Sequence, residues 1–295
     1  MTAHPNDVDV AMIGHYALDK IIYLGKEQLS LGGAVYYGGV ALRRQGFRVA
    51  VVTRLARRDW AMLDELVSEG IEVYAAEASA TSGIENTYPT EDMNHRTCRP
   101  LAFAGAFRPE DIPDLLPRIW LVGPIIAGEV DVPLLRKLHA SGAPVALDIQ
   151  GFIRVPENDQ LVFRPWPDMA EGLGYVKYLK ADDAETLALT GRTDLREAAR
   201  ELAGYGPSEV ALTHGGGLVV YAEGSFCEAA FRPSQIRGRT GRGDTTFATY
   251  VARRLALPPE RACQYAAAVA SLKMEAPGPF RRPLSDVEDY IRRRP

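Results

Sequence analysis

Short apolar runs alternate with segments of helical spacing in the first part of the chain. Strand-like runs at residues 8–13 and 48–53 are followed by helical segments at residues 34–45 and 58–69. A short apolar run bounded by turn residues is typical of a buried strand, whereas apolar residues three or four positions apart mark one face of a helix. The pattern therefore predicts strand, helix, strand and helix in this order.

The same alternation returns in the middle of the chain. Further strands are predicted at residues 119–122, 145–149 and 175–179, and further helices at residues 133–140 and 183–189. Strands that alternate with helices imply crossover connections, so the strands run mostly parallel and helices cover both faces of the sheet. We therefore predict an α/β fold with a mostly parallel central sheet.

Two stretches, residues 19–31 and 83–103, break this rhythm. They contain strand-like pieces with polar alternation and turn residues, and no helix lies between those pieces. We interpret them as antiparallel strands that stand off the main sheet and form a small β lid over a site at its edge. Two surface hairpins without a role are the alternative. The predicted core then comprises residues 1–18, 32–82 and 104–295.

Composition narrows the functional classes. The 295 residues are 46% hydrophobic and 24% charged, which supports a sizeable core and excludes a disordered chain. A net charge of -4 argues against nucleic acid as the main partner, because phosphate neutralisation requires a basic surface. Cys98, Cys227 and Cys263 are too few and too scattered for a disulfide framework or a CxxC metal site.

The apolar runs are short for a membrane span. The longest, residues 119–128, is about half as long as a segment that crosses a bilayer. The N-terminus has no basic segment followed by an apolar stretch, so no signal peptide is expected. We expect a soluble, cytoplasmic protein without a membrane partner.

A glycine-rich stretch near the C-terminus carries the strongest chemical signal. Residues 237–247 read Arg-Gly-Arg-Thr-Gly-Arg-Gly-Asp-Thr-Thr-Phe, and Phe247, Val251 and Leu255 continue at helical spacing. A helix N-terminus offers unpaired N–H groups and partial positive charge, and glycine lets an anion approach the backbone closely. No Gly-Lys-Ser/Thr follows, and the spacing differs from the dinucleotide fingerprint. The loop therefore indicates a phosphate site of another type.

Asp244 lies at the predicted start of this helix. Aspartate is a favoured N-cap residue, so a purely structural cap is one interpretation. The other is a general base that takes a proton from an alcohol, while the loop N–H groups hold the charge on a transferred phosphoryl group. The residues by themselves leave both interpretations open.

Together with the rest of the chain, this loop resembles the ribokinase/PfkB family of carbohydrate kinases. The likeness runs over nearly the whole chain and rests on several segments in order. They are Gly14 and Asp19, the pair Gly32 and Gly33 before a helix that ends at Gly46, the acidic segment from Lys180 to Glu185 with Thr190 and Gly191 after it, the strand end from Leu212 to Gly215, the loop from Gly241 to Asp244, and residues 266–278. The resemblance implies a ribokinase-like three-layer α/β/α fold with a small β lid.

Within that family the chain is most similar to the plant-type myo-inositol kinase branch. Residues 145–150 read Val-Ala-Leu-Asp-Ile-Gln and residues 153–155 read Ile-Arg-Val, and Lys180 with Ala181 fits that branch as well. The resemblance implies an ATP-dependent kinase that phosphorylates a hydroxyl of a small polyol or sugar, with myo-inositol as the first candidate. The implied cofactors are ATP and Mg²⁺, with room for a monovalent cation.

The resemblance also implies roles for single residues. Asp244 would be the general base, and the backbone N–H groups of Gly241, Arg242 and Gly243 would hold the transferred phosphate.

Metal and ligand contacts are carried over in the same way. Glu185 and Asp182 would hold Mg²⁺ through water, although two exposed acids at a helix N-terminus explain the same pattern. The implied substrate contacts are Asp19, Gly33, Tyr37, Gln150 and Arg154. The implied nucleotide contacts are Lys180, Thr213, Gly215 and Gly278.

Several residues depart from the family pattern. Gly238 and Arg239 stand where its last signature starts with Asp-Thr, Arg242 replaces an alanine, Asp182 an asparagine, and Tyr37 the sugar-binding asparagine. The loss of that amide argues against ribose as substrate. The acceptor therefore stays open among a polyol, a furanose sugar, a nucleoside and a sugar phosphate.

The departures also motivate functions of another class. A catalytically degenerate kinase that senses a nucleotide or polyol is one alternative. A nicotinamide-dependent oxidoreductase is disfavoured, because no Gly-x-Gly-x-x-Gly follows the first strand. The expected assembly is a monomer, or a homodimer formed through exposed strand edges of the lid.

Overall fold

The computed structural model describes residues 7–90 and 97–293. Its centre is a nine-stranded sheet in the order β15-β14-β13-β12-β9-β8-β1-β4-β5. The strands from β13 to β5 run parallel, and β14 and β15 add an antiparallel edge. The strands are β1 (Asp7–Ile13), β4 (Val49–Ala56), β5 (Glu72–Ala78), β8 (Leu116–Val122), β9 (Val145–Asp148), β12 (Tyr178–Asp182), β13 (Glu209–His214), β14 (Gly217–Ala222) and β15 (Ser225–Ala230).

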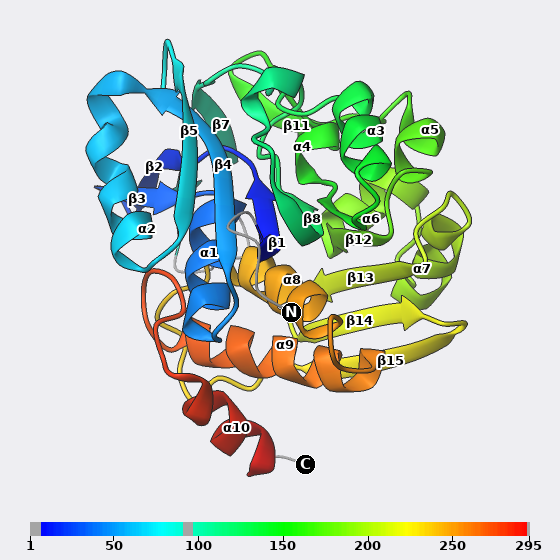
Figure 1. The fold of residues 1–295 in the computed structure, drawn as a ribbon. Helices are drawn as coiled ribbons and strands as arrows, with labels where there is room; N and C mark the ends of the chain where they lie inside the picture. Colours follow the sequence, from blue (N-terminus) through cyan, green and yellow to red (C-terminus); the bar gives the residue numbers. More distant parts are fainter. Residues whose placement is uncertain (1–6, 91–96, 294–295) are drawn as a thin grey trace.

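Helices cover both faces of this sheet (Figure 1), which confirms the predicted three-layer α/β/α fold. Alternate strand residues point to opposite faces, so Val10 and Met12 join one core and Ala11 and Ile13 join the other. The first core is packed by α1 (Ala34–Arg44), α8 (Arg242–Arg253) and α9 (Pro259–Met274). The second is packed by α3 (Val132–Ala140), α5 (Met169–Leu173) and α7 (Leu195–Ala203). The remaining helical elements are η1 (Arg57–Leu63), α2 (Asp64–Ser68), η2 (Pro109–Asp111), α4 (Gln150–Ile153), α6 (Asp183–Thr190) and α10 (Leu284–Arg292).

A separate four-stranded sheet, in the order β3-β2-β6-β7, is formed by the two stretches predicted as a lid. Its strands are β2 (Ala17–Tyr23), β3 (Lys26–Gly32), β6 (Gly83–Tyr88) and β7 (Thr97–Ala102). Of the predicted lid, residues 91–96 lie outside the described residues. β2 and β6 pair in parallel, so the prediction of antiparallel strands is wrong for this central pair. The cause is that β2 follows the end of β1 and β6 follows the end of β5, and both enter the small sheet from the same edge of the parallel core.

Two further predictions differ from the observed elements. Residues 58–69 form the 3-10 helix η1 followed by α2 instead of one continuous helix. The strand predicted at residues 175–179 begins only at Tyr178. Tyr175 and Val176 instead lie in turns after α5, where their N–H groups donate to the carbonyls of Gly172 and Leu173. Their side chains still pack in the second core, which explains the strand-like apolar pattern.

β10 (Arg154–Glu157) and β11 (Gln160–Phe163) pair in antiparallel fashion and form a separate two-stranded sheet. Within residues 7–90 and 97–293, no helix combines the length and the apolar character that a bilayer span requires.

Candidate active site

The carboxyl ends of the parallel strands meet at one edge of the main sheet, and several of the predicted residues gather there. β9 ends at Asp148 and β12 ends at Asp182. A Cβ atom added at Gly243 would lie 3.6 Å from Lys180 Nζ, which places the glycine loop directly beside β12. In open parallel sheets this edge is the usual location of a ligand site.

An aromatic ring shapes the glycine loop. Gly241 is the N-cap of α8 with a φ of 77°, and a Cβ atom there would lie 2.0 Å from the Tyr37 ring. Only glycine suits both the left-handed backbone and this close approach. Tyr37 is buried in the first core, and its hydroxyl donates to the Leu31 carbonyl at 3.2 Å. Tyr37 therefore supports the loop, and its predicted contact with the substrate stays a prediction.

The backbone donors of the loop are not equally available. The Arg242 N–H donates to the Arg239 carbonyl at 3.1 Å, so this predicted phosphate donor already has an acceptor. In the part of the chain that the structure describes, the N–H groups of Gly241, Gly243 and Asp244 have no such partner. Donors at a helix N-terminus that lack an acceptor are suited to an anion.

Asp244 lies in the first turn of α8, and the N-cap is Gly241, so the interpretation of Asp244 as the cap is wrong. Burial raises the pKa of Asp244 to about 6, and the nearby carboxylate of Asp148 adds to that rise. Three cations oppose it, namely Lys180, Lys273 and Arg154. At neutral pH the group is therefore mostly ionised, with a higher proton affinity than an exposed aspartate. A general base requires this combination.

A buried lysine lies between two carboxylates beneath the loop. Lys180 is 4% exposed, and its Nζ lies 3.0 Å from Asp148 Oδ2 and 3.3 Å from Glu185 Oε2. Burial disfavours the charge, but the nearby carboxylates, with Asp148 and Glu185 first among them, together outweigh burial and raise the pKa of Lys180. The ammonium is thus fixed next to the loop, where the family resemblance implies a contact with the donor.

The two predicted magnesium residues have different surroundings. Asp182 caps α6, because its Oδ1 accepts the Glu185 N–H at 2.8 Å. Glu185 Oε2 accepts the Asp182 N–H at 2.7 Å, while Glu185 Oε1 is buried and has no hydrogen-bond partner in the described ranges. Glu185 is fully buried, so the alternative of two exposed acids at a helix N-terminus is wrong.

The residues present fit a hydrated magnesium ion. Across the described residues, no group of three or more histidine, cysteine, aspartate or glutamate side chains is arranged to hold a metal directly. Mg²⁺ keeps several waters and takes few carboxylates. The buried Oε1 atom of Glu185 could accept a hydrogen bond from one of those waters, whereas Asp182 is partly occupied by its capping contact.

Asp19 and Gly33 lie where the four-stranded sheet meets the core. Asp19 is 6% exposed, and its Oδ1 accepts the Ile84 N–H at 2.9 Å, which links β2 to β6. Gly33 has a φ of 93°, and a Cβ atom there would lie 2.2 Å from the His15 carbonyl oxygen. Both residues, which are predicted to contact the substrate, are therefore held in place by the junction of the two sheets.

Gln150 is the first residue of the short helix α4, and Arg154 follows its last residue. The Gln150 N–H donates to Asp148 Oδ1 at 3.1 Å, and its side-chain amide reaches the Ile125 carbonyl at 3.5 Å. Arg154 is buried, and its charge lowers the pKa of Asp244. Among the described residues its guanidinium has no ion-pair partner within 4.0 Å. A buried guanidinium in this position is suited to a phosphate or a polar substrate.

The predicted nucleotide contacts are only partly brought together. Thr213 is opposite Asp182 in the register of β12 and β13, at the same sheet edge as the loop. Gly215 lies in the exposed turn after β13, and Gly278 lies in the segment after α9 with open space where a side chain would begin. Nucleotide contacts at these positions stay predictions.

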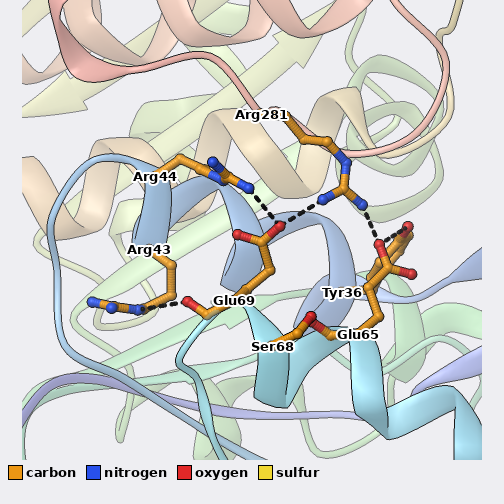
Figure 2. A network of polar contacts seen from close by, with 7 residues as sticks. All are labelled: Tyr36, Arg43, Arg44, Glu65, Ser68, Glu69 and Arg281. Atoms are coloured by element: carbon orange, nitrogen blue, oxygen red, sulfur yellow. Dashed lines mark hydrogen bonds and ion pairs between the residues drawn. The ribbon is translucent and has the colours of Figure 1, made fainter.

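An ion-pair network anchors the helix that carries Tyr37 (Figure 2). Arg281, in the segment between α9 and α10, contacts Glu65 and lies 2.6 Å from Glu69 Oε1. The Tyr36 hydroxyl donates to Glu65 at 3.0 Å. Because Tyr36 precedes Tyr37 in α1, these contacts tie the support of the loop to the C-terminal segment.

Three residues of this region were not singled out in the sequence. Asp148 holds Lys180, Lys273 lies below the loop, and Asn86 lies in β6 opposite Ile21 and Cys98. Asn86 is 5% exposed, and its Oδ1 is buried without a hydrogen-bond partner among the described residues. The signal that could have found them is a polar side chain at a position where the surrounding pattern predicts a buried apolar one.

Comparisons with known proteins agree with this geometry. Residues 151–284 match the pfkB family of carbohydrate kinases. The chain is 34% identical to a pyrophosphate-dependent kinase in the ribokinase family, solved with a pyrophosphate analog and myo-inositol; the match covers 95% of this chain and 99% of that chain with a TM-score of 0.88.

Two more proteins are similar over most of the chain. One is a pyrophosphate-dependent myo-inositol-1 kinase converted into a myo-inositol-3 kinase by two substitutions, 32% identical over 97% of this chain and 99% of that chain with a TM-score of 0.87. The other is the cytidine kinase of Thermococcus kodakarensis, 25% identical over 256 residues, which are 83% of this chain and 88% of that protein.

Proposed function

This chain belongs to the ribokinase/PfkB family of carbohydrate kinases, and from that premise we propose that it transfers a phosphoryl group from pyrophosphate to a hydroxyl of myo-inositol. The observation that carries the proposal is Asp244 in the first turn of α8, beside open loop N–H groups and three cations. Pyrophosphate replaces ATP as the preferred donor because the similar structures at 32–34% identity are of pyrophosphate-dependent kinases. ATP, implied by the family resemblance, is the competing donor.

The proposed reaction is an in-line phosphoryl transfer. Asp244 takes the proton of the acceptor hydroxyl as its oxygen attacks one phosphorus of pyrophosphate. The bond from that phosphorus to the bridging oxygen breaks, and inorganic phosphate leaves with the bonding electron pair. The products are inositol phosphate and phosphate, with the proton on Asp244 until solvent or phosphate removes it.

The charges around Asp244 support a small, highly charged donor. Pyrophosphate has no base or sugar to bind, so its affinity must come from groups that neutralise oxygen atoms. The open N–H groups of Gly241 and Gly243 and the guanidinium of Arg154 are groups of this kind. Bound magnesium, hydrogen-bonded through its water to Glu185, would neutralise further donor charge.

The acceptor side supports a polyol. Asp19 and Asn86 are buried polar residues on neighbouring strands of the four-stranded sheet, and the half-buried Gln150 reaches the Ile125 carbonyl with its side-chain amide. A site built from buried polar groups selects a substrate whose hydroxyls pair with them, because analogues that lack a hydroxyl leave those groups without partners. Myo-inositol carries a hydroxyl on every ring carbon and satisfies this condition.

A donor-by-acceptor matrix tests the proposal. Purified protein with magnesium is given pyrophosphate or ATP, each with myo-inositol, ribose, fructose, cytidine or glycerol, and phosphorylated acceptor is quantified. We expect product only with pyrophosphate and myo-inositol. Product with ATP but not with pyrophosphate would overturn the proposed donor. Phosphorylated cytidine in place of phosphorylated myo-inositol would overturn the proposed acceptor. Binding of pyrophosphate without any product would favour the degenerate sensor.

A further inference from the structure

A second buried lysine lies below the glycine loop. Lys273, in the last turn of α9, is 2% exposed, and its Nζ donates to the carbonyl oxygens of Gly238, at 3.0 Å, and of Thr240. The Tyr37 ring centre lies 5.2 Å from the same nitrogen. Within residues 7–90 and 97–293, Lys273 forms no ion pair with a carboxylate. Its partners are therefore backbone oxygens and the face of a ring.

Such a set of partners is what a monovalent cation would use. Backbone carbonyl oxygens replace the hydration shell of a potassium ion in proteins. A lysine ammonium is also a compact single charge with three donors. The two carbonyls precede Gly241, whose backbone directs the loop into α8. A cation bound to these two carbonyls thus fixes the loop segment that leads to the anion-binding N–H groups.

We propose that the Lys273 ammonium is a built-in cation that holds the glycine loop in its anion-binding shape, in place of a dissociable monovalent cation. The residues do not fit a free monovalent ion at the same carbonyls, because a second positive charge there would meet the ammonium at contact distance in a buried site. The monovalent cation that the family resemblance left open is therefore not needed at this place.

The neighbouring residues agree with this arrangement. Gly238 stands where the family signature has an aspartate, and a Cβ atom at Gly238 would lie 2.7 Å from the Ala276 carbonyl oxygen. A side chain does not fit there, so no carboxylate competes for the ammonium. Burial lowers the pKa of Lys273 to about 8, against the opposing charge of Asp244, and the group is still mostly protonated at neutral pH.

The first experiment is a cation series with the wild-type protein. Its activity and melting temperature are measured in potassium, sodium, lithium and tetramethylammonium chloride at equal ionic strength. We expect activities within twofold of one another and no melting shift specific to potassium. An activation by potassium of more than tenfold, or a potassium-specific melting shift, would overturn the proposal. The activity arm rests on the proposed kinase function, whereas the melting arm does not.

The second experiment removes the ammonium. Lys273→Ala should lose at least tenfold in activity and regain part of it with potassium or methylammonium, and its melting temperature should rise more in potassium than in tetramethylammonium. Lys273→Met, which fills the space without a charge, should lose activity without such rescue. Lys137→Ala is the matched control, because exposed Lys137 also donates to a backbone carbonyl, that of Pro109. Lys273→Ala and Lys273→Met with full activity, or Lys273→Ala without cation rescue, would contradict the proposal.

Discussion

Two buried lysines act on Asp244, and the protein holds their charges in different ways. Lys180 contacts Asp148 and Glu185, so its charge is balanced by carboxylates of the protein. Lys273 donates to two backbone carbonyls. Burial lowers the pKa of Lys273, whereas the nearby carboxylates raise the pKa of Lys180. The carboxylates beside Lys180 balance its charge and join it to the neighbouring elements. Lys273 has carbonyl partners that carry no full charge, so its positive charge remains to attract an incoming anion.

Substitution of Asp244, on which both lysines act, should show the largest effect. Asp244→Asn keeps the shape of the side chain but removes the proton acceptor, so kcat should fall by about 10²–10⁴-fold. Phosphorylation of myo-inositol is measured under saturating donor and acceptor, with circular dichroism as the folding control. A variant that retains near-normal kcat would remove Asp244 from its assigned role.

Removal of the Lys180 ammonium should lower the free energy of unfolding more than removal of the Lys273 ammonium. Lys180→Met leaves two buried carboxylates without their cation and should lower the free energy of unfolding by about 3–5 kcal/mol. Lys273→Met leaves only backbone carbonyls without a donor and should cost about 1–3 kcal/mol. Urea denaturation measures both, and Lys180→Met combined with Glu185→Gln should recover part of the first loss. Equal costs for the two lysines would erase the contrast between them.

Two glycines of the loop offer a matched pair. Gly241→Ala forces a Cβ atom to within 2.0 Å of the Tyr37 ring at a φ of 77°, and should destabilise the protein by about 1–3 kcal/mol. Gly243→Ala meets only Lys180 at 3.6 Å and has no positive φ, so its effect on stability should be smaller. Thermal melts compare the two variants. The same melting temperature for both would show that Tyr37 does not constrain the loop.

The smallest expected effect is the pH dependence of kcat/KM near neutral pH. Since the pKa of Asp244 is raised to about 6, kcat/KM should fall tenfold per pH unit below that value as the base becomes protonated. It should be level up to about pH 8 and fall above it, where the Lys273 ammonium that holds the loop loses its proton. Loss of either lysine removes a positive charge that lowers this pKa, so Lys273→Met should shift the acid limb to higher pH. A limb that shifts to lower pH would contradict the assignment of the charges.

Much of the fold was predictable because its causes are local. The alternation of apolar runs and helical faces marks β1, α1, β4, α3 and α6, since burial of one face depends on residues close together in the chain. The glycine loop and Asp244 were predictable for the same reason. A helix N-terminus with glycines before it carries its own N–H groups and dipole, whatever surrounds it.

The sequence by itself therefore determined the α/β alternation, the anion loop and the candidate base. Only the tertiary structure decided that β2 and β6 pair in parallel, that Asp148 and Lys180 meet, and that Lys273 reaches Gly238 and Thr240. Each of these contacts joins segments of different elements, far apart along the chain. Periodicity describes one element at a time, and the partner of a buried charge is chosen by how the elements pack.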